Sequence, residues 1–86
     1  MNFVHYDLGN LRAGQTIEVQ LDLAANVVLL DPTNFNLYRS GQPFSFFGGH
    51  VRQSPYRLGV PSDGHWHLAI DLGGRAGTIK TSVRVF

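Results

Sequence analysis

Apolar and polar residues alternate with a period of two along several short stretches of this chain. In the clearest stretch, residues 16–23, every second residue from Ile17 to Leu23 is aliphatic and the residues between them are polar. This is the period of a strand with one buried face, because successive side chains of a strand point to opposite sides. The same pattern recurs in residues 4–8, 56–60, 65–72 and 77–85. We expect a strand in each, with the first two forming an antiparallel pair at the start of the domain.

Two further stretches predict strands of another kind. Residues 27–30 are four consecutive aliphatic residues, too few for a helix, and they predict a central strand buried on both faces. Residues 44–49 combine aromatic residues with Gly48 and Gly49, and they predict a strand that ends in a bend or bulge. The total is about seven strands.

One short helix is expected between these stretches, at residues 32–40. Asp31 can cap its start, Pro32 suits its first position, and Gly41 suits the position after its end. Phe35 and Tyr38 are three residues apart and therefore share one side of this helix.

Seven strands with one apolar face each need a second layer to cover that face, and a single short helix cannot supply it. We therefore expect an all-β, seven-stranded antiparallel β-sandwich, jelly-roll-like or a flattened barrel. The 86 residues are 43% hydrophobic, contain no low-complexity tract or linker, and suffice for one core. We expect residues 1–86 to be a single domain.

Composition excludes several kinds of chemistry. The chain has no cysteine, so disulfides, thiolate nucleophiles and cysteine-based zinc sites are ruled out, and any metal would need histidine and carboxylate ligands. The net charge is +1, with no cluster of basic residues interleaved with aromatics, so we expect neither a nucleic-acid nor a membrane partner. With no basic leader and no apolar run of bilayer length, we expect a cytoplasmic location.

Several motifs together resemble a known family. They are Asn2–Gly9, Asn34–Tyr38 with Gly48–Val51, and Gly64–His67 with Ile70–Gly74. The sequence is similar to the bacterial domain of unknown function family 1883 over essentially its whole length. The resemblance implies a small β-rich bacterial domain, found alone or joined to others such as Toll/interleukin-receptor-like domains, which would suit sensing or recognition. More distantly, the strand layout is similar to that of jelly-roll domains appended to secreted peptidases.

His65 and His67 give the sharpest local signal for a site. Alternate residues of a strand project to the same side about 6.5–7 Å apart, so two imidazoles could share one metal ion such as zinc. A third ligand would come from His50, His5 or Asp71. The alternative is a solvent-facing pair beside a buried Trp66. We favour no metal and no cofactor, and name His65, His67 and His50 as the ligands if a metal binds.

Nothing in the sequence identifies a catalytic site. Asp71 is four strand residues from His67, about 13 Å away, too far for a hydrogen-bonded pair. The serines lie on no strand-turn-helix elbow, and Glu18 belongs to an alternating exposed face. Strands rather than helices follow the glycine clusters at 48–49 and 73–77, which favours bends over phosphate-binding loops. We therefore expect a protein that is not an enzyme.

The middle third of the chain offers a second candidate surface. Phe46 and Phe47 must point to opposite faces if they lie in a strand, so that one would be exposed beside Arg52 and Arg57 as a surface for a ligand or partner. The alternative is that the short helix covers that second face and closes the core.

The leading hypothesis is a non-catalytic recognition or regulatory module for an unknown protein or small ligand. One alternative is a metal-dependent or carboxylate enzyme, which requires His50, His65, His67 and Asp71 to converge in a pocket. A further alternative is a unit that self-associates as a homo-oligomer through an exposed strand edge.

Overall fold

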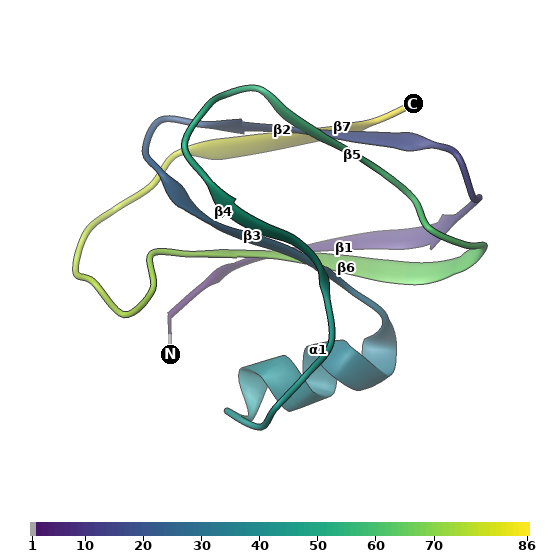
Figure 1. The fold of residues 1–86 in the computed structure, drawn as a ribbon, viewed down its shortest axis with the longest axis horizontal. Helices are drawn as coiled ribbons and strands as arrows, with labels where there is room; N and C mark the ends of the chain where they lie inside the picture. The colour runs from purple at the N-terminus through teal and green to yellow at the C-terminus, as the bar shows by residue number, and fades with distance from the viewer. Residues whose placement is uncertain (1) are drawn as a thin grey trace.

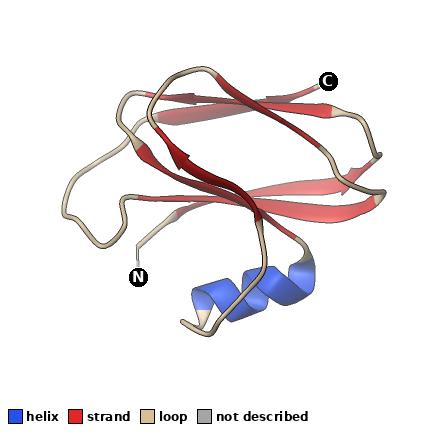
Figure 2. Cartoon of the chain, in the orientation of Figure 1, coloured by secondary structure: helices blue, strands red, loops and turns tan. Residues whose placement is uncertain are grey.

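A computed structural model describes residues 2–86 and contains seven strands and one helix (Figures 1 and 2). The elements are β1 (Val4–Leu11), β2 (Thr16–Leu21), β3 (Ala25–Leu30), α1 (Pro32–Arg39), β4 (Phe47–Val51), β5 (Tyr56–Gly59), β6 (Gly64–Asp71) and β7 (Thr81–Val85). The expected number of strands and the position of the helix are confirmed.

The strands form two antiparallel sheets that pack face to face. The order is β1-β6-β3-β4 in the four-stranded sheet and β5-β2-β7 in the three-stranded sheet. Figure 1 shows the two sheets as separate layers, with α1 against the far side of the four-stranded sheet. The expected β-sandwich is confirmed, and over residues 2–86 the two sheets do not join into a closed barrel.

The expected pairing of the first two strands is wrong. β1 pairs with β6 in one sheet, whereas β2 pairs with β5 and β7 in the other. The turn after Leu11 carries the chain from one layer to the other, because each strand buries its apolar face against the opposite sheet.

The main core lies between the sheets and contains the inward residues that the period of two indicated. Ile17 and Val19 from β2 share it with Leu68 and Ile70 from β6, all four fully buried, and Leu21 packs against them. Trp66 is buried there too and donates its indole N–H to the carbonyl of Ser62 at 2.9 Å.

A second, smaller core lies between the four-stranded sheet and α1. Phe35 and Tyr38 of the helix pack on Val28, Leu30 and Ala69. β3 is therefore buried on both faces, as its four aliphatic residues indicated. The helix begins as expected, because an Asp31 carboxylate oxygen accepts the backbone N–H of Asn34 at 2.7 Å.

β4 begins later than expected. Phe44 lies before the strand and packs on Tyr38 with ring centroids 5.1 Å apart. The first part of this apolar stretch therefore packs on α1, and only the part from Phe47 onward belongs to the sheet. Gly48 and Gly49 lie inside β4 rather than in a bend that ends it.

The only helix of the described chain, α1, has eight residues, and within residues 2–86 no helix has the length and apolar character to cross a bilayer.

Candidate metal centre

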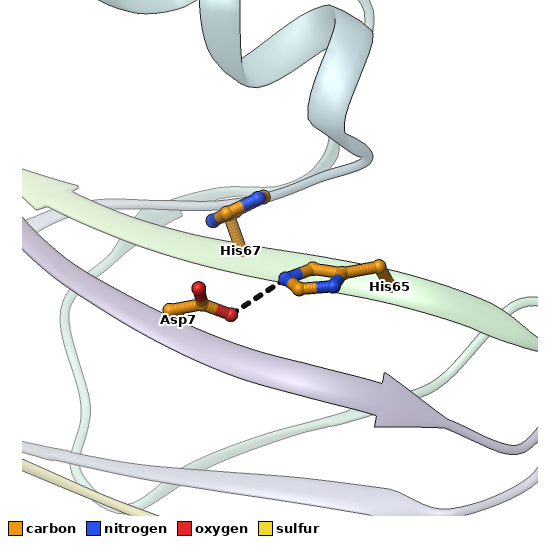
Figure 3. Close-up of side chains that lie close together, drawn as sticks. All are labelled: Asp7, His65 and His67. Atoms are coloured by element: carbon orange, nitrogen blue, oxygen red, sulfur yellow. Dashed lines mark hydrogen bonds and ion pairs between the residues drawn. The ribbon is translucent and has the colours of Figure 1, made fainter.

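Three side chains converge on the outer face of the four-stranded sheet, the face that α1 partly covers. Asp7 comes from β1, and His65 and His67 come from β6 (Figure 3). Asp7 is the direct neighbour of His67 across the β1–β6 pair. One potential ligand atom from each residue lies within 4.8 Å of the other two.

A bulge in β1 positions Asp7. The β1–β6 register shifts between Asp7 and Gly9, where Gly9 adopts a φ of 70° that favours glycine. The Asp7 carboxylate accepts the Gly9 backbone N–H at 3.0 Å and the His65 Nε2–H at 2.6 Å. These two hydrogen bonds, the one from Gly9 first, lower the pKa of Asp7 and keep its carboxylate ionised at neutral pH.

His67 is held by His5 and Phe35. His5 Nε2 and His67 Nδ1 share a hydrogen bond of 2.9 Å. The Phe35 ring of α1 stacks on both imidazoles, with centroid distances of 4.3 Å to His5 and 4.5 Å to His67. Burial beneath this ring lowers the pKa of His67 against the opposing effect of Asp7, so its imidazole is neutral at neutral pH.

The cluster remains open to solvent on one side. The side chains of Asp7 and His65 are 55% and 39% exposed, respectively. Imidazole nitrogens and carboxylate oxygens are donors that zinc takes in sites with an open coordination position.

His50, the expected third ligand, is not part of this cluster. It lies on β4 opposite Asn26 and bonds to the Asn26 side chain at 3.2 Å. Asn26 is also opposite Asp71, whereas His67 is opposite Leu30 at the other end of β3. These register positions are four residues apart along β3, and this distance separates His50 from His67.

Asp71 points to the outer face of the sheet, toward α1, and is buried there. Its carboxylate accepts hydrogen bonds from the Tyr38 hydroxyl at 2.6 Å, the Asn26 side-chain amide at 2.9 Å and the Gly73 backbone N–H at 2.8 Å. The second core covers this residue, and Asp71 ties α1 to β6 rather than facing His67.

Glu18 is not exposed, contrary to the sequence-based expectation. It lies between Arg57 of β5 and Arg84 of β7, directly opposite both, at N–O distances of 3.0 and 3.5 Å. The two guanidinium groups cover its carboxylate, whose side chain is 5% exposed. Arg57 is thus bound to the three-stranded sheet and does not join a surface with Phe46 and Phe47.

The aromatic pair of the middle segment divides between two neighbours. Phe46 packs beside Phe44 on the helix side of the four-stranded sheet, with ring centroids 5.5 Å apart. Phe47 contacts Trp66 on the side that faces the other sheet, with ring centroids 6.0 Å apart. Each keeps about half of its surface exposed, at 47% and 51%. Arg52 lies just after β4 beside a hollow of about 120 Å³ that neither phenylalanine lines.

Sequence reasoning missed Asp7 as the partner of the two histidines. The signal was present, since Asp7 and His5 alternate with apolar residues as His65 and His67 do. Only the pairing of β1 with β6, which the alternation does not specify, brings these polar faces side by side.

These observations define a small two-sheet β-sandwich domain with an exposed histidine–carboxylate cluster. Its sequence matches the model of the family described as Domain of unknown function (DUF1883) over residues 1–86, and the chain belongs to that family. The resemblance seen in the sequence is confirmed. No match was found among curated proteins or among solved structures.

Proposed function

We propose that this domain is a non-catalytic binding module whose site takes a divalent transition metal, zinc above all, through Asp7, His65 and His67. The observation that carries the proposal is the convergence of one carboxylate and two imidazoles within 4.8 Å on two paired strands. Zinc binds such ligands at about 2.0–2.2 Å, so small rotations of exposed side chains would complete the set.

The hydrogen bonds around the cluster suit a metal site. In the tautomer with a proton on Nδ1, His67 donates to His5 and keeps Nε2 available as a ligand. Histidine ligands commonly donate their second N–H to a neighbouring acceptor, which fixes the ring orientation. His5 fills that role, and Phe35 holds both rings in one stack.

Three protein ligands leave at least one coordination position for water or for an atom of a binding partner. Small-molecule and active sites are usually concave. Within residues 2–86, neither the hollow beside Arg52 nor the larger cleft beside Arg75 is lined by Asp7, His65 or His67. The exposed position on a strand face therefore favours binding over catalysis.

Isothermal titration of the metal-free chain with zinc tests this proposal. We expect one zinc per chain and a raised melting temperature, because a ligand that binds only the folded state stabilises it. Asp7→Asn and His65→Ala change exposed side chains and should each weaken binding by at least about tenfold. His5→Phe keeps a ring against Phe35 but removes the acceptor for His67, and it should also weaken binding by about tenfold.

His50→Ala is the matched control, because His50 lies at the other end of the same sheet face. It should bind zinc like the parent chain. A parent chain that shows neither heat nor a changed melting temperature, or an Asp7→Asn chain with unchanged affinity, would contradict the proposal.

A further inference from the structure

A cleft lies at the end of the sandwich where the N-terminal segment passes the loop between β6 and β7. Its volume is about 790 Å³, within the range of small-molecule sites. Residues 2–4 line one side, and residues 70–79 line the other. Figure 1 shows this loop, in yellow-green, beside the N-terminal segment.

Part of the cleft wall is apolar. Val4, Leu72 and Ile79 pack on the edge of the main core, and each keeps part of its surface accessible. Phe3 comes from the side of the second core. These side chains would contact the hydrocarbon body of a ligand, because apolar contact is the main source of affinity in such clefts.

The rim of the cleft carries one cationic side chain, that of Arg75. Arg75 is held by its own loop, since its backbone N–H and its Nε both donate to the Leu72 carbonyl, at 3.4 and 3.3 Å. Its terminal guanidinium nitrogens bond to no atom of residues 2–86. The one acidic lining residue, Asp71, has both carboxylate oxygens engaged by Tyr38, Asn26 and Gly73.

The loop also offers backbone donors. The N–H groups of Ala76, Gly77 and Thr78 donate to no acceptor within residues 2–86, and all three residues are exposed. Exposed amides next to a guanidinium group are suited to a carboxylate, which can accept several hydrogen bonds at once. No helix follows this loop, so it differs from a phosphate-binding loop.

We propose that this cleft binds a small amphipathic carboxylate, with its apolar body between Phe3, Leu72 and Ile79 and its carboxylate against Arg75. This inference does not depend on the metal site. None of the three proposed metal ligands lines the cleft. The experiment below removes metal so that a bound ion cannot capture the carboxylate.

The test is a titration of the ¹⁵N-labelled full chain with phenylacetate in the presence of a chelator, followed by amide chemical shifts. We expect saturable shifts at Phe3 and at residues 73–79. 2-Phenylethanol has the same apolar body without the charge and should bind about tenfold more weakly or worse. Arg75→Ala should weaken phenylacetate binding by at least about tenfold, whereas Arg75→Lys should retain part of it.

Arg52→Ala is the control, since Arg52 is an exposed arginine outside the cleft. It should bind phenylacetate like the parent chain. The proposal is overturned if the cleft amides show no saturable shift, if the acid and the alcohol bind equally, or if Arg75→Ala leaves the affinity unchanged.

Discussion

Gly48 lies in β4 against the backbone of Val27 and Val28 in β3. Its φ of 119° is outside the range that residues with a side chain adopt readily, and a Cβ atom there would collide with the Val27 carbonyl oxygen. Because the obstacle is backbone of a central strand, no side-chain rotation can relieve it. The close approach of these two strands requires glycine at this position.

Gly48→Ala should therefore destabilise the domain by about 2–4 kcal/mol, through backbone strain and disruption of the β3–β4 pair. The measurement is the free energy of unfolding from urea titration. Gly59→Ala is the control, since Gly59 lies in β5 without a positive φ and a Cβ there would have open space. It should change stability by less than about 1 kcal/mol. Equal losses in the two variants would contradict the role given to Gly48.

The helix α1 is attached to the sheet by one buried hydrogen bond in addition to its apolar contacts. Tyr38, which is 2% exposed, donates its hydroxyl to Asp71, which is 6% exposed. Burial and then the neighbouring Asp71 raise the pKa of Tyr38 well above its usual range, so the phenol keeps its proton and continues to donate. The Asp71 carboxylate, on the sheet face under α1, thus receives one of its hydrogen bonds from the helix.

Tyr38→Phe removes that donor and should cost about 1.5–3 kcal/mol, because a buried carboxylate oxygen then lacks its partner. Tyr6→Phe is a matched control, since Tyr6 makes a hydroxyl bond of the same 2.6 Å length to the neutral Thr81 side chain. That variant should lose only about 0.5–1.5 kcal/mol. Urea unfolding of both chains measures the difference. If Tyr38→Phe lowers the free energy of unfolding no more than Tyr6→Phe does, the Tyr38–Asp71 bond stabilises the domain no more than a bond between neutral groups.

Over the whole molecule, the histidine–carboxylate cluster couples stability to pH. The pKa of His67 is lower in the folded chain than its ordinary value, so the unfolded chain binds more protons in the interval between the two. Stability must then rise with pH across that interval and fall on acidification. Asp7, whose pKa is also lowered, contributes in the same direction at more acidic pH.

With a chelator present, the free energy of unfolding should be lower at pH 5.5 than at pH 7.5. The free energy of unfolding can change by at most about 1.4 kcal/mol per pH unit for one bound proton. His67→Asn removes the titrating ring and should flatten this slope between these two values. A slope that stays the same in His67→Asn would assign the pH dependence to other groups.

Local sequence patterns predicted the elements of this molecule better than their partners. The period of two located most strands, and the Asp31–Pro32 pair located the helix start, because both depend on neighbours in the chain. The prediction that Glu18 is exposed was wrong, because its burial depends on Arg57 and Arg84 from the two flanking strands.

The candidate site shows the same division. His65 and His67 share one face because of their spacing, which the sequence determines directly. Their placement beside Asp7, and not beside His50, depends on the β1–β6 pair and on the bulge at Gly9. Alternation alone does not specify which strands become neighbours.

The pairing of β1 with β6, and of β2 with β7, also has a consequence for how the chain folds during synthesis. During synthesis, β1 is made more than fifty residues before its partner β6. β2, which also pairs with β5, meets its second partner β7 later still. Topologies dominated by such distant contacts fold slowly. The last residue, Phe86, exchanges two backbone hydrogen bonds with Thr16, at 2.7 and 2.9 Å. A folded protein joined directly after Phe86 would hinder the pairing of β7 with β2. A flexible spacer between the two should therefore improve the yield of folded fusion protein.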